Sequence, residues 1–176
     1  MIERIKVNTN FFLDEFIDPV TYFTDADNGL SKIDPSLIDC VQLLRDKYGK
    51  SINVNGWWKH LPVDLLVFDP VSFLGVMESK KVPVWSGLRT ELCKIGATKS
   101  AHKLGKAIDP KGDEKIFMQI VRDNAKQFYD LGLRRTEDIS ITNGWLHMDT
   151  ETRNCKPNSI RVIDRTKCTE TIYFRP

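Results

Sequence analysis

The stretch SAHKLGKAIDP, at positions 100–110, constrains the path of the chain more than any other segment. It places His102 and Asp109 on either side of Gly105. On one helix the two side chains would stand about two turns, roughly 10 Å, apart along the axis. A metal ion with bonds of about 2.0 to 2.2 Å needs donor atoms within a few Å of each other. If both residues bind one ion, the chain must fold back between them, and Gly105 permits that turn most easily. The alternative is a loop or hairpin with an exposed histidine and aspartate.

Length and composition predict a folded chain with a substantial core. The sequence has 176 residues, of which 41% are hydrophobic and 28% are charged, and we expect a single domain over residues 1–176. The formal net charge is +2. The basic pairs Lys80-Lys81 and Arg134-Arg135 are isolated, so we expect no nucleic-acid partner.

The N-terminal sequence MIERIKVNTNFF shows no basic segment followed by a long apolar run and a small-residue cleavage site. No stretch approaches the roughly eighteen apolar residues of a membrane span. We therefore expect no signal peptide, synthesis in the cytoplasm and no membrane insertion. The cysteines are spaced too widely for a zinc ribbon or redox motif, so we expect reduced thiols at Cys40, Cys93, Cys155 and Cys168.

Two segments have the pattern of amphipathic helices. Residues 34–49 combine Asp34 as a cap, Pro35 at the first helical position and an apolar stripe that ends at Gly49. The second predicted helix runs from Asp113 to Leu131, with a stop at Gly132. Its expected apolar face consists of Ile116, Phe117, Ile120, Val121 and Phe128.

The remaining patterns indicate short strands. KSINVNGWW (50–58) and KKVPVWSGLR (80–89) predict strands that end in turns, and the segment 59–80 predicts an irregular connection with Pro62 and Pro70. RRTEDISITNGWLHMD (134–149) predicts a hairpin, because Asn143-Gly144 suits a type I′ turn. IRVIDRTKCTETIYF (160–174) is another possible hairpin. The predicted fold class is therefore α+β, with helices packed on a small antiparallel sheet.

His147 lies on the second strand of the first predicted hairpin. There Trp145, His147 and Asp149 point to one side, while Leu146 and Met148 point to the other and suit the core. A surface histidine is the simpler interpretation of His147 taken alone. However, two of the three histidines of the chain lie beside acidic residues on segments that turn. Two histidines and one carboxylate leave a zinc position open for water, as in catalytic sites.

These segments resemble the M15 zinc peptidases, a family of D-Ala-D-Ala carboxypeptidases and bacteriophage endolysins. SAHKLGKAIDP follows the family pattern S-x-H-x-x-G-x-A-x-D, and WLHMD is similar to its closing H-x-D segment. SGLR at 86–89 resembles the Ser-Gly-x-Arg turn, and LLRDKYGKSINVNGWW resembles the preceding helix and strand of phage members. The resemblance covers about residues 10–153. It implies the hedgehog-like α+β fold, with His102, Asp109 and His147 as zinc ligands.

The chemistry of such a site suggests roles for further residues. Zinc lowers the pKa of a bound water from about 15.7 toward 7 and polarises the scissile carbonyl. Arg89 is the candidate for holding the developing oxyanion or a substrate carboxylate, with a plain surface arginine as the alternative. Ser100 either contacts substrate, orients His102 or caps a turn. Trp145 is a further candidate for substrate binding.

The catalytic carboxylate departs from the family pattern. Many M15 enzymes carry it three residues before the last histidine, where this chain has Gly144. Glu137 on the preceding strand is our first choice for the general base, since it can reach across the hairpin. A register slip would present Asp138 instead. Asp149 is the second choice, or else it orients a ligand.

The expected function is a zinc metallopeptidase that hydrolyses a peptide bond in peptidoglycan stem peptides, as phage endolysins do. The alternative is a catalytically silent metal-binding module or virion structural module on the same fold. Without a signal peptide, the protein would reach the cell wall after release through a holin-type partner, or as a virion component.

Overall fold

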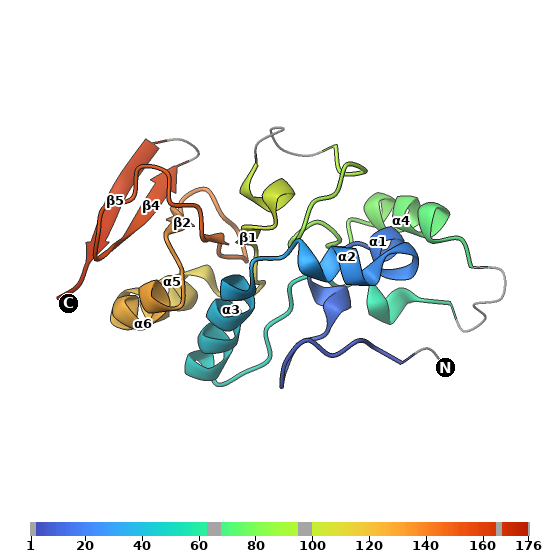
Figure 1. Ribbon diagram of the computed structural model, residues 1–176, viewed down its shortest axis with the longest axis horizontal. Helices are drawn as coiled ribbons and strands as arrows, with labels where there is room; N and C mark the ends of the chain where they lie inside the picture. Colours follow the sequence, from blue (N-terminus) through green and yellow to red (C-terminus); the bar gives the residue numbers. More distant parts are fainter. Residues whose placement is uncertain (1–2, 63–67, 95–99, 165–166, 176) are drawn as a thin grey trace. The chain divides into compact units, whose positions relative to one another are not determined.

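The computed structural model describes residues 3–62, 68–94, 100–164 and 167–175 (Figure 1). It divides into two compact units, one formed by Met1–Ile33 and Val54–Gly105 and the other by Asp34–Asn53 and Lys106–Pro176. We call them the first and the second unit. That the chain forms a single domain stays a prediction.

The first unit is built from short helices. They are η1 (Leu13–Glu15), α1 (Pro19–Thr24), α2 (Ala26–Ser31), η2 (Trp58–His60), α4 (Pro70–Ser79) and η3 (Ala101–Leu104). Helix α1 packs against α2 and α4. The core includes Phe16, Ile17 and Trp57, all essentially buried, and the Trp57 indole N–H donates to the Ile17 carbonyl at 2.9 Å.

Helix α4 corrects one prediction. The segment 59–80 was expected to be irregular, yet Pro70–Ser79 is helical; residues 63–67 of that segment lie outside the described residues. Asp69 accepts hydrogen bonds from the backbone N–H groups of Val71 and Ser72, and Pro70 occupies the first turn. The apolar residues of α4 lie all around the helix rather than on one stripe, and Val71 and Val76 are exposed. The hydrophobic periodicity of the sequence therefore did not indicate a helix here.

The predicted strands over 50–58 and 80–89 are wrong. Neither segment holds a named strand, and the first contributes only an isolated bridge between Asn53 and Lys111 within the second unit. Their backbones instead make single hydrogen bonds in irregular conformation, such as Gly56 N–H to Pro83 O and Leu88 N–H to Phe16 O. The alternating apolar residues of these segments are buried from an irregular backbone and do not form the face of a sheet.

The second unit contains the sheet. Its strands are β1 (Ala107–Ile108), β2 (Arg135–Glu137), β3 (Met148–Asp149), β4 (Ser159–Asp164) and β5 (Lys167–Tyr173). Their order is β1-β3-β2-β4-β5, and β2 pairs with β4 in parallel while the other neighbours are antiparallel. The α+β class is confirmed. The expectation of a purely antiparallel sheet is wrong, because β4 returns to β2 through a long connection.

The helices of the second unit follow the sequence closely. α3 (Pro35–Tyr48) starts at Asp34, whose side chain accepts from the Ser36 N–H, and ends at Gly49 with φ of 70°. The helix predicted over 113–131 forms as two pieces, α5 (Glu114–Asp123) and α6 (Ala125–Asp130). α3 packs on α5 and α6 packs on β4 (Figure 1).

The break between α5 and α6 lies at Asn124. Its φ of −122° leaves the helical region. Its side-chain amide donates to the Ile120 carbonyl at 2.9 Å, in addition to its backbone N–H, which donates to the same carbonyl at 3.1 Å. The predicted apolar face is correct for Phe117, Val121 and Phe128, but Ile116 is 46% exposed.

The two predicted hairpins have different outcomes. Strands β4 and β5 pair antiparallel as expected for the segment 160–174, of which 165–166 lie outside the described residues. Strands β2 and β3 also pair antiparallel, but the two-residue turn at Asn143-Gly144 is wrong, because the whole segment between the strands is a loop. The Gly144 N–H donates to the Glu114 carboxylate at 2.9 Å. His147 therefore precedes β3 and does not lie within it.

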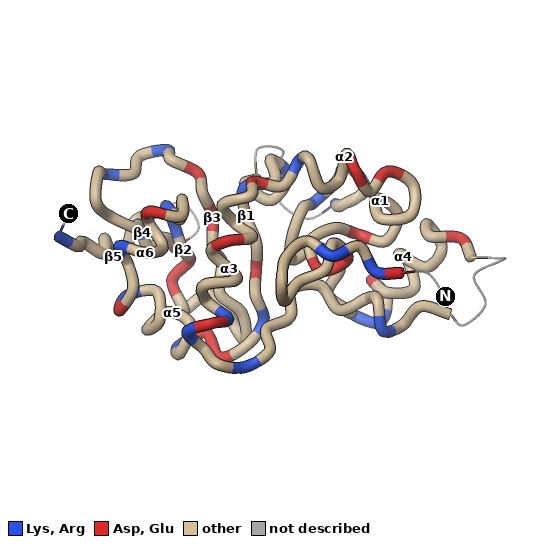
Figure 2. Tube along the Cα trace, turned by 60° about the horizontal axis from the view of Figure 1, so that its bottom comes forward, with Lys and Arg blue, Asp and Glu red and all other residues tan. Residues whose placement is uncertain are grey.

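Lys and Arg residues are interspersed with Asp and Glu residues along the trace (Figure 2). No helix among the described residues combines the length and the apolar character that crossing a bilayer requires. The cysteines are free thiols.

Candidate metal centre

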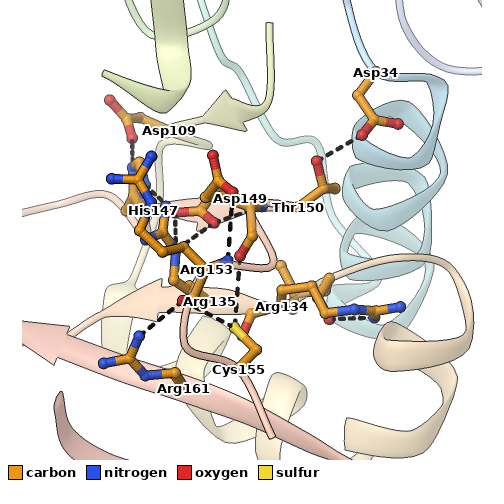
Figure 3. Close-up of polar contacts among 12 residues, drawn as sticks. Asp34, Asp109, Arg134, Arg135, His147, Asp149, Thr150, Arg153, Cys155 and Arg161 are labelled. Carbon is orange, nitrogen blue, oxygen red and sulfur yellow. Dashed lines mark hydrogen bonds and ion pairs between the residues drawn. The ribbon is translucent and has the colours of Figure 1, made fainter. Parts of the chain in front are cut away.

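The candidate site in the second unit is centred on His147, which lies between two carboxylates (Figure 3). Its Nδ1 is 2.9 Å from Oδ1 of Asp109, and its Nε2 is 3.1 Å from Oδ2 of Asp149. His147 is 8% exposed and Asp109 is 4% exposed. The histidine thus has an acidic partner at each ring nitrogen, away from bulk water.

The sheet explains why Asp109 and His147 meet. Strand β1 pairs with β3 in antiparallel register, and its last residue, Ile108, lies opposite Met148. Asp109 follows Ile108 and His147 precedes Met148, so the next step of the same register brings the two side by side. Leu146 and Met148 are buried as predicted, and they fix this segment on the core.

Asp149 is anchored from two directions. The Nε of Arg135 donates to both carboxylate oxygens, at 2.8 and 3.1 Å. The backbone N–H of Glu151 donates to Oδ1 at 3.0 Å. Arg135 lies opposite Asp149 on β2, which brings the guanidinium and carboxylate to the same face of the sheet. Asp149 is 0% exposed, so it does not face solvent.

These contacts determine the protonation of the cluster. Burial lowers the pKa of His147, but its hydrogen bonds to Asp109 and Asp149 outweigh burial and raise the pKa to about 10. Burial raises the pKa of Asp149, yet its contacts with His147 and Arg135 leave that pKa below its usual value. Both directions favour a protonated imidazole next to an ionised Asp149.

His102 lies in η3 of the first unit and is 3% exposed. Its Nδ1 is 2.8 Å from the carbonyl oxygen of Gly87. Because a carbonyl only accepts, Nδ1 must be the donor. The backbone N–H of Arg89 in turn donates to the carbonyl of His102 at 3.1 Å. The SGLR turn and the histidine motif, which are separate in sequence, therefore hold each other in place.

Gly105 ends η3 in the left-handed conformation, with φ of 67°. A Cβ atom at this position would lie 1.7 Å from the carbonyl oxygen of Lys32. Only glycine fits this close approach of two backbones, and the turn predicted between His102 and Asp109 is therefore present.

Arg89 is partly buried and its Nε donates to the Trp85 carbonyl at 3.0 Å. It lines a cavity of about 670 Å³ in the first unit. Lys32 and Lys103 also line this cavity, together with the acidic side chains of Asp25 and Glu91. The cavity walls thus carry both signs of charge, with cations in the majority.

The structure places the other candidate residues as follows. Ser100 precedes η3, but its side chain makes no capping hydrogen bond. The backbones of Trp145 and Lys111 form an isolated antiparallel β-bridge. The Nζ of Lys111 lies 5.4 Å from the centre of the Trp145 ring. Glu137 ends β2 and is partly buried. Since alternate residues of a strand share a face, Glu137 is on the same side of the sheet as Arg135.

Arg135 is the site residue that the sequence did not single out. It was noted only as half of an isolated basic pair. The signal that could have found it is its place two residues before Glu137 on a predicted strand, opposite the strand that carries the H-x-D segment. A buried aspartate on the partner strand needs a cation of this kind.

A scan of family models and searches of curated proteins and of solved structures find no match to the chain.

Proposed function

We propose that the chain is a zinc-dependent peptidase that hydrolyses a peptide bond in peptidoglycan stem peptides, with a hedgehog-like fold similar to that of the M15 family. The observation that carries the proposal is the buried contact between Asp109 and His147, whose Oδ1 and Nδ1 atoms are 2.9 Å apart. An oxygen and a nitrogen at this distance must share a proton or a cation.

The donor set fits zinc. Imidazole nitrogen and carboxylate oxygen are common zinc ligands, and bonds of about 2.0 to 2.2 Å require donor atoms a few Å apart, as Asp109 and His147 are. Because Asp109 and His147 are buried, an ion between them has little access to water, and this favours binding through several protein ligands. In this proposal zinc takes the place of the proton between Nδ1 and Asp109.

His102 is the proposed third ligand. Within the described residues, His102, Asp109 and His147 form a set of buried side chains that each offer one ligand atom. His102 and Asp109 are only seven positions apart in the sequence, on either side of Gly105. Two histidines and one carboxylate leave a coordination position for water, as catalytic zinc sites do.

Bound zinc would supply a more acidic water and a polarised scissile carbonyl. Arg89 would stabilise the negative charge that develops on the carbonyl oxygen, or hold a substrate carboxylate. Its place in the wall of the 670 Å³ cavity, near Lys32 and Lys103, supports this role, because a peptide with free carboxylates would be attracted there. Ser100 and Trp145 are proposed to contact the substrate.

Glu137 is the proposed general base, which would accept the proton of the attacking water and return it to the leaving amine. Its position on the Arg135 side of β2 supports this role. Asp149 is less suited, since Arg135, Glu151 and His147 already engage both of its oxygens.

A catalytically silent metal-binding or virion structural module is the second candidate. The observation that favours it is Gly144, which occupies the position of the usual M15 catalytic carboxylate. For either candidate we propose delivery to the cell wall by a holin-type partner or within a virion, without nucleic-acid binding.

Hydrolysis of purified peptidoglycan tests the proposal. We expect the zinc-loaded protein to release new amino termini, and we expect a chelator to abolish and added zinc to restore the activity. Mass spectrometry of the products identifies the bond. A protein that binds zinc stoichiometrically but releases no termini would support the silent module instead.

A further inference from the structure

We propose that Arg135 is a positioning residue, which acts through Asp149 to hold the His147 ring so that Nε2 carries the proton and Nδ1 presents its lone pair to the metal. The inference rests on the proposed function in taking His147 as a zinc ligand. It adds a residue that the histidine motifs do not contain.

The first step is the rigidity of Asp149. Its carboxylate accepts from Arg135 Nε through both oxygens and from the Glu151 backbone N–H. Arg135 and Asp149 also face each other across the paired strands β2 and β3. The carboxylate is therefore fixed by a charged side chain, a backbone amide and the sheet itself (Figure 3).

The second step is the direction of the hydrogen bond to His147. Oδ2 of Asp149 lies 3.1 Å from Nε2. An ionised carboxylate accepts and cannot donate, so Nε2 must carry a proton to make this bond. Nδ1 lies 2.9 Å from Asp109. When zinc takes the place of the proton on Nδ1, the proton on Nε2 stays and the Nδ1 lone pair is directed at the metal. A partner on the second nitrogen of a ligating histidine fixes the tautomer and the ring orientation.

The third step is the dependence on Arg135. Without the guanidinium, Asp149 would be a buried carboxylate with 0% exposure and only one neighbouring amide. Its carboxylate would then lose the charged contact that fixes its direction. The His147 ring would lose its fixed partner at Nε2, and Nδ1 would no longer be held in one direction.

The chain offers a matched control. Arg4 and Asp14 form a second guanidinium–carboxylate pair in the first unit, with two hydrogen bonds of 2.9 and 2.6 Å to an aspartate that is 2% exposed. Arg4→Met removes a pair of similar burial that contacts none of the proposed ligands.

The test measures zinc affinity by chelator competition in the wild type, Arg135→Met and Arg4→Met. We expect Arg135→Met to weaken zinc binding by about 10- to 100-fold, and Arg4→Met to leave the dissociation constant unchanged within about twofold. The ¹⁵N chemical shifts of the His147 ring in the zinc-loaded wild type should show a metal on Nδ1 and a proton on Nε2. Arg135→Lys should recover part of the lost affinity.

Two results would overturn the inference: equal zinc affinity in the wild type and Arg135→Met, or zinc on Nε2 of His147 in the wild type. If Arg135→Met does not fold, the same ring spectrum in the wild type and the zinc affinity of Asp149→Leu decide the question. A wild type that binds no zinc contradicts the proposed function itself, whereas a wild type that binds zinc independently of Arg135 contradicts only this inference.

Discussion

Arg89 and Glu137 are the residues whose side chains the proposed reaction uses directly. Arg89→Lys keeps the charge but loses the planar guanidinium, which can donate two parallel hydrogen bonds. We expect normal zinc content and a loss of up to about 10² in turnover of peptidoglycan. Arg122→Lys is the control, because Arg122 forms an exposed ion pair with Glu170. Unchanged turnover in Arg89→Lys would show that Arg89 has no such role in the reaction.

Replacement of the proposed base tests Glu137 at the same scale. Glu137→Gln should retain zinc and lose activity by about 10² to 10⁴. Asp138→Asn is the matched control on the next position. The backbone N–H of Ser140 and the hydroxyl of Thr169 donate to the Asp138 carboxylate and lower its pKa, so it is poorly suited to accept a proton. If Asp138→Asn loses the activity and Glu137→Gln keeps it, the base has been assigned to the wrong residue.

Single residues of the candidate site could be named from the sequence only where a motif marked them. His102, Asp109 and His147 stand in short motifs with fixed spacing, so their types and positions carried the signal. Arg135 could not be named, because its role depends on the register of β2 against β3, which is a property of the folded sheet. The burial of Asp149 was missed for the same reason.

At the scale of elements, the turn at the end of η3 gives a stability prediction. Gly105→Ala must adopt a positive φ and also place a Cβ atom against the Lys32 carbonyl. We expect it to destabilise the protein by more than about 2 kcal/mol. Gly49→Ala has nearly the same φ, 70°, but nothing lies within 4 Å of its Cβ, so it should cost about 1 to 2 kcal/mol. Urea unfolding measures both variants. Equal losses would mean that the close approach to Lys32 does not constrain the fold.

The Asp-Pro capping signal marks helices of this chain that hydrophobic periodicity does not. The helices α1, α3 and α4 all begin with Asp-Pro, in which the aspartate side chain accepts from backbone N–H groups of the first turn. Only α3 also has a clear apolar stripe, and only α3 of these three was predicted. Asp109-Pro110 has the same dipeptide without a helix directly after it, and the Asp109 carboxylate contacts His147.

At the scale of the whole molecule, the reactivity of each cysteine thiol depends on its burial in the folded protein. Burial raises the pKa of Cys40 to about 12 and the residue is 0% exposed. Cys168 is exposed, and hydrogen bonds from Thr171 and Arg161 outweigh its slight burial and lower its pKa. At pH 8 Cys168 should therefore have the larger thiolate fraction. Peptide mass spectrometry after iodoacetamide treatment should find Cys168 modified first and Cys40 modified only after unfolding. Comparable rates in the folded protein would show that the core around α3 opens readily.

Zinc stoichiometry tests the central claim most directly. Native mass spectrometry should find one zinc ion per chain in the wild type and in His60→Ala, since His60 is exposed at the end of η2 and belongs to no proposed site. His102→Ala should bind no zinc at equimolar metal, because the set of ligands would be incomplete. Full zinc occupancy in His102→Ala, or a wild type that binds none, would contradict the account.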